Sequence, residues 1–323
     1  MRTIYLKELA DHFSSLRFLL MASLVFMASV VGVYLAGQGV RELLSRGAGP
    51  YLEGRAFLML FTAPGAMLSL ASLFALAGPL APLVLGFDSV SRERSQGTLS
   101  KILSQPVYRD EVLLGKFLAG LAAMAVLLAA LLLILSGLAM LGLGLVPSAG
   151  EAARLACWYL LSLLYLGLWL GLAILLSVAC RSAPASAMAC AALWVAAGFF
   201  VPALGQTAAG AAVVVADPSA PTQAERAAYD RVSRAVTMAS PPAVFGEASR
   251  ILLDPSHRGS RQDLSIATMS RLDRFLVSQF QGGVGLGQSL ILLLPHLAVL
   301  AAAALVSFFL SFLVFARQEV RSA

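Results

Sequence analysis

The sequence predicts an all-α membrane protein with six transmembrane helices. Of its 323 residues, 59% are hydrophobic and 12% are charged, whereas a soluble domain is about 25% charged. Several apolar runs reach the length of about 20 residues that a helix needs to cross the hydrocarbon core. Runs such as residues 121–145 do not alternate apolar and polar residues, as the strands of a membrane barrel would. We therefore expect the spans to be helices.

Six apolar runs qualify as spans: 18–36, 62–87, 115–145, 155–180, 184–204 and 288–315. The first run is longer than the apolar core of a signal peptide and follows a charged segment, so we expect it to stay in the protein. The second run contains Pro64, Pro79 and Pro82, which predicts a kink. Because a freed backbone group in lipid must find a partner on another helix, these prolines favour a position inside the bundle.

The distribution of Lys and Arg predicts the orientation. Six spans place both termini on one side of the membrane, and the short segments on that side carry eleven Lys and Arg residues, against four in the two short loops opposite. The rule that positive charge stays inside then makes both termini and the segment 88–116 cytoplasmic. The segment 205–287 faces outward and is left out of the count, because loops of that length cross regardless of charge.

Three regions follow from these spans. Residues 1–204 form a transmembrane domain with the first five spans, and residues 288–323 form the last span and a cytoplasmic tail. Between them we expect a small extracytoplasmic helical insertion, 205–287, packed on the outer membrane face. Its first part is rich in small and turn-forming residues, and short helices are predicted at 223–239, 240–255 and 262–280.

The spans contain almost nothing that could carry out catalysis. The exception is His296, and an ionisable residue inside the membrane is a candidate functional site by default; a neutral histidine hydrogen-bonded to another helix is the favoured interpretation. No Walker A motif is present, since residues 110–117 read "DEVLLGKF". Three cysteines without ligand spacing predict no metal site. We expect no enzyme activity, no bound cofactor and no nucleic-acid partner, because the basic residues flank membrane helices.

One segment differs from the rest of the chain. Residues 87–117 contain nine charged residues between two long apolar runs. Asp88, with Ser89 or Ser91, can cap a helix there. An apolar patch with helical spacing follows, formed by Leu99, Ile102 and Leu103. Such a short amphipathic helix suits a groove in a soluble partner, where charge complementarity sets the register; the alternative is an ordinary solvated connection.

Residues 91–116, "SRERSQGTLSKILSQPVYRDEVLLGK", resemble the cytoplasmic segment of ABC-2 type transporter permeases. The similarity is greatest to the permeases of the nitrous-oxide-reductase maturation and gliding-motility transporters. The matching positions are Glu93, Arg94, Gly97, Thr98, Leu99, Leu103, Ser104, Pro106, Val107, Arg109, Glu111, Gly115 and Lys116. Tyr108 stands where the family usually has serine. Residues 5–18 and 240–255 resemble the family's N-terminal helix and the segment before its last span.

The resemblance implies a complex of two permease copies, most simply a homodimer, with two ABC ATPase subunits that bind ATP and Mg²⁺. Residues of about 88–104 act in this family as a coupling helix in a cleft of the ATPase, and spans tilt when the ATPase dimer closes. The implied coupling residues are Asp88, Arg92, Glu93, Arg94, Gly97, Thr98, Leu99, Ile102 and Leu103. Glu93 and Arg94 are the leading contact candidates, and Gly97 allows close approach or a bend.

The N-terminal segment predicts an amphipathic helix in the plane of the lipid headgroups. Its matching residues are Lys7, Glu8, Leu9 and Arg17. The resemblance implies that this element also borders the ATPase; the alternative is a simple juxtamembrane helix.

The resemblance also implies the function and location. We expect a permease subunit in the bacterial cytoplasmic (inner) membrane that couples ATP hydrolysis by a separate ATPase to export or translocation of an unidentified substrate. The alternative is an ABC-driven mechanical or scaffold component that acts on an extracytoplasmic accessory protein without transport. A polar path between subunits favours the first; a closed, leucine-rich seam favours the second.

Overall fold

The computed structural model describes residues 2–45, 56–62, 69–98, 109–213, 222–254 and 285–317. Within these ranges the chain is helical and contains no strand. The helices are α1 (Arg2–Ser14), α2 (Leu16–Ser45), α4 (Met59–Thr62), α5 (Leu70–Ala77), α6 (Leu80–Gly86), α7 (Ser91–Ser95), α9 (Arg109–Leu143), α10 (Ala149–Ala179), α11 (Ala183–Val195), η1 (Ala196–Phe200), α12 (Val201–Ala212), α13 (Gln223–Thr237), α14 (Pro241–Leu253) and α17 (Leu286–Arg317).

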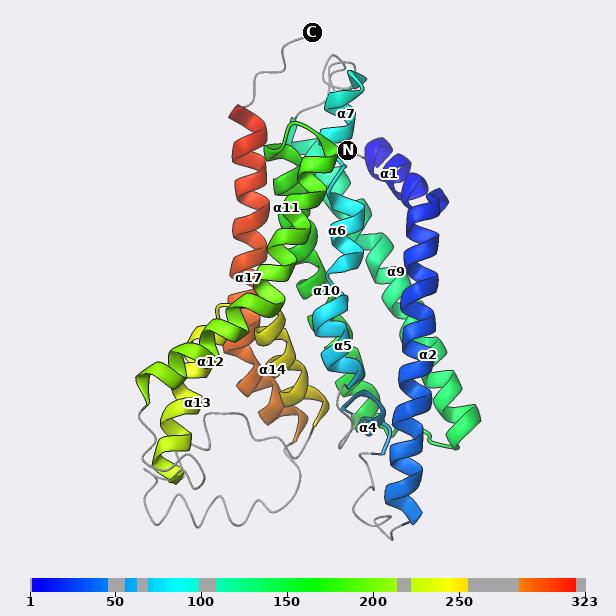
Figure 1. Cartoon of the computed structure of the whole chain (residues 1–323). Coiled ribbons are helices and arrows are strands. Elements are labelled where there is room, and N and C mark those ends of the chain that lie inside the picture. The colour runs from blue at the N-terminus through cyan, green and yellow to red at the C-terminus, as the bar shows by residue number, and fades with distance from the viewer. Residues whose placement is uncertain are drawn as a thin grey trace.

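Six stretches of the described chain are long and apolar enough to cross a membrane, which confirms the predicted number. They are Leu16–Gln38, Leu70–Ser95, Asp110–Leu143, Ala149–Ala179, Ala183–Ala212 and Leu286–Arg317. Helix α1 and the C-terminal end of α17 lie at the same end of the bundle (Figure 1). The order of the spans and this shared end agree with the sequence-based layout.

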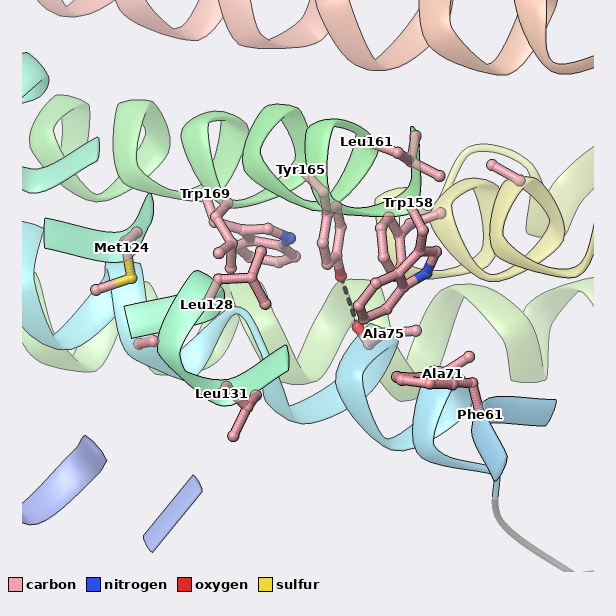
Figure 2. Close-up of a cluster of buried hydrophobic side chains, with 14 of the residues drawn as sticks. Phe61, Ala71, Ala75, Met124, Leu128, Leu131, Trp158, Leu161, Tyr165 and Trp169 are labelled. Carbon is pink, nitrogen blue, oxygen red and sulfur yellow. Dashed lines mark hydrogen bonds between the residues drawn. The ribbon is translucent and has the colours of Figure 1, made fainter. Parts of the chain in front are cut away.

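Helix α10 forms the centre of the bundle and packs against α6, α9, α11, α14 and α17 (Figure 1). Its largest buried side chains, Trp158, Tyr165 and Trp169, point toward α5 and α9 (Figure 2). Leu128 and Leu131 of α9 belong to the same buried cluster. Aromatic side chains of this size bury 150–250 Å² each, so they account for much of the packing between helices.

The second span is broken between α5 and α6, as its prolines predict. Pro79 has no N–H, so the carbonyl of Ala75 loses its partner one turn on. The hydroxyl of Tyr165 donates to that carbonyl at 2.6 Å (Figure 2). The indole Nε1 of Trp194 donates to the next carbonyl, that of Leu76, at 2.8 Å. Pro79 and Pro82 are both buried, so the expected position inside the bundle is confirmed for them. Pro64 lies outside the described residues.

Helix α14 confirms the short amphipathic helix predicted at 240–255. It begins at Pro241 and ends at Leu253, and its apolar side is buried. It does not sit on the bundle but contributes to the same core as the spans: Phe245 stacks on Tyr165 with ring centroids 4.3 Å apart, and Trp158 donates to Ser249 at 3.0 Å. Figure 1 shows α14 beside the N-terminal half of α17.

The fifth span extends further than predicted. We expected it to end near residue 204, followed by turns, but the helix continues through η1 and α12 to Ala212. Residues 205–212 are rich in alanine, the strongest helix former, which outweighs the two glycines. Helix α13 confirms the helix predicted at 223–239 and packs against α12. The helix predicted at 262–280 lies outside the described residues.

Candidate functional site

The charged segment, defined here as residues 87–98, directly follows α6 in the chain. It consists of a turn, the single-turn helix α7 and a second turn at Gly97. Gly97 has φ 68°, a left-handed conformation that favours glycine, and it follows the end of α7. The segment lies at the end of the bundle that also carries α1 (Figure 1). Leu99, Ile102 and Leu103, the predicted apolar patch, lie outside the described residues.

The start of α7 is capped by another helix. The backbone N–H groups of Val90 and Ser91 donate to the hydroxyl of Ser177 on α10, at 3.0 and 3.1 Å. The local side-chain cap that we expected from Asp88, Ser89 or Ser91 does not form, because Val90 occupies the cap position. A free N–H at a helix start needs an acceptor, and α10 supplies it from 86 and 87 residues further along the chain.

The carboxylate of Asp88 binds the first span. Arg17, at the start of α2, donates from Nη1 to Asp88 Oδ2 at 2.7 Å. The guanidinium of Arg17 also lies 5.7 Å from the ring centroid of Phe87, within the range of a cation–π contact. Two adjacent residues of the charged segment therefore bind the same arginine of α2.

Arg94 binds the end of α10. Its guanidinium donates to the carbonyls of Val178 at 3.1 Å and Cys180 at 3.3 Å. The last carbonyls of a helix have no partner within the helix, and they attract a cation. Arg94 thus fixes the charged segment to the same helix that caps α7.

The most deeply buried ionic contact of the segment is with Lys116. This residue lies on α9, its side chain is only 4% exposed, and its Nζ donates to Glu93 at 2.7 Å and to Glu8 of α1 at 2.9 Å. We call Glu8, Glu93 and Lys116 the ionic joint. The preceding residue, Gly115, allows α1 to approach α9, since a Cβ there would lie 3.1 Å from Ile4 Cγ2. The two adjacent motif residues therefore have different roles: Gly115 leaves room for α1, and Lys116 binds the two carboxylates.

Two side chains of α1 near the joint, Glu8 and His12, have shifted pKa values. Burial alone raises the pKa of Glu8, but attraction to Lys116, their hydrogen bond and attraction to Lys7 bring the net pKa below its ordinary value. Burial lowers the pKa of His12, and the nearby carboxylate of Glu8 opposes that effect only in part. At neutral pH the site therefore holds an ionised Glu8 beside a neutral His12.

A groove of about 860 Å³ runs between α1, the charged segment and α9. Its lining includes the joint and Asp88 together with apolar side chains of α6 and α10. The charged segment also carries exposed side chains: Arg92 is 58% exposed and lies 3.8 Å from Asp88, and Ser95 and Gln96 are exposed. Arg92 and Gln96 also line the groove. Some side chains of the segment are therefore bonded to the bundle, and others, Arg92, Ser95 and Gln96, are exposed; we call these three exposed residues the outer side of the segment.

The structure places the predicted residues in different settings. Glu93 and Arg94, expected at a partner surface, bond to this chain. Arg92 is on the outer side, and Thr98 donates to the Glu93 carbonyl at 3.2 Å. In α1, Leu9 packs on the main buried cluster, while the side chain of Lys7 is exposed and lies 3.6 Å from Asp11.

Sequence reasoning missed Lys116 and Ser177 as site residues. Lys116 was visible as a motif position and as a basic flank, but nothing in the sequence shows that two carboxylates converge on it. His296, on α17, has a buried Nδ1 with no hydrogen-bond partner within the described ranges, so the hydrogen bond that we expected from another helix is not seen at that atom.

The fold and this site define a multi-pass helical membrane protein whose charged segment is built into its transmembrane helices. The chain belongs to the ABC-2 family of transporter proteins, whose family model matches residues 2–320. This confirms the resemblance seen in residues 91–116.

Two curated relatives carry the name "Probable ABC transporter permease protein NosY". The one from Stutzerimonas stutzeri is 34% identical over 125 residues, which cover 38% of this chain and 40% of the relative. The one from Pseudomonas aeruginosa is 35% identical over 117 residues, which cover 36% of this chain and 37% of the relative. The matches thus span well under half the length of either relative.

Proposed function

We propose that this chain is the membrane-spanning subunit of an ABC transporter and couples ATP hydrolysis by a separate ATPase subunit to movement of a substrate across the bacterial inner membrane. Family membership supports the class of protein. In this proposal the charged segment and both termini are cytoplasmic. ATP and Mg²⁺ bind to two ATPase copies, and the chain pairs with a second copy of itself and catalyses no reaction of its own.

The observation that carries the proposal is the way the charged segment is fixed to the bundle. Separate polar contacts join it to α1 and α9 through Lys116, to α2 through Arg17, and to α10 through Arg94 and Ser177. A solvated connection would need none of these contacts. Packed interiors transmit displacement because they deform little, so a push on this segment reaches four helices together.

The outer side of the segment is the surface that we assign to the ATPase. Arg92, Ser95 and Gln96 are exposed there. Exposed charge at a rim sets register and association rate, which suits a contact that must stay aligned while the ATPase opens and closes.

Reconstitution tests the proposal. The permease is placed in nanodiscs with its ABC ATPase, and ATP turnover is compared with that of the ATPase alone. We expect the wild-type permease to stimulate turnover and the Arg92→Glu/Gln96→Glu variant to lose that stimulation. The matched control is Arg226→Glu on α13, an exposed arginine at the other end of the molecule. The proposal would be contradicted if the Arg92→Glu/Gln96→Glu variant stimulated ATP turnover as strongly as the Arg226→Glu control does.

A further inference from the structure

The ionic joint links elements that the chain keeps far apart. Glu8 and Lys116 are separated by 108 residues and Glu93 and Lys116 by 23. We infer that Lys116 is a positioning residue whose ammonium holds α1, the charged segment and α9 as one body, and that Glu93 serves this joint and not the ATPase surface. The statement about Lys116 stands by itself, and the statement that Glu93 does not serve the ATPase surface rests on the proposed function.

The chemistry of Lys116 suits such a joint. An ammonium group offers three donors around one point, so it can bind two carboxylates that arrive from different directions. Both carboxylates use a single oxygen on the same Nζ, at 2.7 and 2.9 Å. Gly115 places α1 against α9 at this level, because it leaves room for Ile4. The joint thus lies where the two helices approach most easily.

The joint is a poor means of stabilising the fold, which points to a role in positioning. Three buried or nearly buried charges sum to one net negative charge, and Glu93 Oε2 is buried with no hydrogen-bond partner among the described residues. Buried ion clusters often contribute less than apolar residues of similar size would. The cluster does hold α1, the charged segment and α9 in one relative position. Without Lys116, the two carboxylates of Glu8 and Glu93 would repel each other and that position would be lost.

The two sides of the charged segment separate positioning from contact. Arg92 and Glu93 are neighbours in the sequence, but successive helical residues point about 100° apart. The Glu93 side chain is 15% exposed and that of Arg92 is 58% exposed. Arg92 has one ionic contact, at 3.8 Å with Asp88 of the same segment. Substituting Glu93 or Lys116 should therefore alter the position of the segment, and substituting Arg92 should alter mainly what binds to it.

Spin-label distances test the joint without any ATPase. Labels are attached at Asp11→Cys on α1 and Gln96→Cys beside α7, both exposed, in a full-length chain whose three native cysteines are serine. We expect Lys116→Met to widen the distance distribution by about twofold, since it leaves two carboxylates unpaired at the contact. Arg92→Met, which loses only a long 3.8 Å contact with Asp88 of the same segment, should leave the distribution unchanged.

A distribution for Lys116→Met that matches wild type in position and width would overturn the joint. Should Lys116→Met fail to fold, Glu93→Gln keeps the side-chain shape and the Lys116–Glu8 contact. It should still widen the distribution, and no change in it would equally overturn the inference.

A second measurement separates the joint from the proposed function. With the ABC ATPase added, Lys116→Met should leave its affinity for the permease within about twofold while stimulated ATP turnover falls at least about tenfold, because only transmission is lost. Arg92→Glu should weaken the affinity itself. If Glu93→Gln weakens affinity as much as Arg92→Glu does, Glu93 is a contact residue and the assignment is wrong. If no ATPase binds wild type, the proposed function fails while the spin-label result still decides the joint.

Discussion

Burial decides what each charged residue of this chain does. Arg92 and Glu93 are adjacent, yet the Arg92 side chain is 58% exposed and Glu93 binds a buried lysine. Only 12% of the residues are charged, and several of those at the charged segment have partners far away in the sequence. Because these charged side chains are few and paired within the protein, we infer that they fix the position of the charged segment and do not simply keep it in contact with water.

The pKa of Glu8 gives a prediction at this scale. Because its pKa in the folded protein is lowered from the ordinary value of 4.5, Glu8 stabilises the fold fully above that pH and loses its contribution as the pH falls through the lowered pKa. Glu8→Gln should therefore unfold more easily by about 1.5–3 kcal/mol near neutral pH.

Thermal unfolding in detergent at several pH values measures this difference. The gap between wild type and Glu8→Gln should be constant above pH 4.5 and narrow below it. A gap that stays the same into strong acid would show that Glu8 is not ionised in the joint.

Sequence reasoning identified the charged residues at this scale but not their partners. Glu8, Glu93 and Arg94 were all selected, whereas Lys116 and Ser177 were not. Motif positions reveal residue types, but the partner of a side chain depends on how helices pack, and contacts across 86 or 108 residues leave no local pattern. The outward role expected for Glu93 and Arg94 came from the resemblance alone.

At the scale of elements, the break between α5 and α6 shows how a span tolerates proline. The carbonyls freed near Pro79 are taken up by Tyr165 and Trp194, from two different helices. The sequence predicts the kink and the need for partners, since proline lacks an N–H. It could not say which aromatic residues would act, because that depends on the rotation of α10 and α11.

A double-mutant cycle tests this exchange of donors. Tyr165→Phe should destabilise the protein by about 1 kcal/mol, since it leaves the Ala75 carbonyl without a donor. In a Pro79→Ala background the restored N–H can reach the same carbonyl, so the effect of Tyr165→Phe should shrink. Unfolding by denaturing detergent measures both, and equal effects in the two backgrounds would contradict the explanation.

The contact between α1 and α9 gives a second prediction for elements. Gly115→Val places side-chain atoms against Ile4, which is already 3.1 Å from an added Cβ. Crowding of this kind costs about 1–3 kcal/mol, and unfolding measurements should show that loss. Ile4→Ala should recover part of it in the double variant. Failure of Ile4→Ala to recover any stability would mean that α1 does not pack there.

At the scale of the whole molecule, the six spans were predictable because apolar length is a strong signal. The extension of the fifth span to Ala212 and the insertion of α14 into the core were not. Helix α14 is as amphipathic as a surface helix would be, so its sequence does not reveal whether lipid, water or other helices cover its apolar side.

Orientation is the molecular property that the proposed function requires first. Single cysteines at Ser95 on α7 and Arg226 on α13 lie at opposite ends of the molecule (Figure 1). In intact cells a membrane-impermeant maleimide should label the cysteine at 226, and the one at 95 only after permeabilisation. The reverse pattern would place the charged segment outside the cell, where no ATP-driven partner could reach it.

In the proposed function, an ATPase acts on this bundle through the outer side of the charged segment. A photo-crosslinking amino acid at Gln96 tests it most directly, in the assembled complex with its ABC ATPase. We expect a permease–ATPase adduct from position 96 whose yield changes with bound nucleotide, and none from the same photo-crosslinking amino acid placed at position 226. An assembled, ATP-hydrolysing complex that gives no adduct from position 96 would contradict the account.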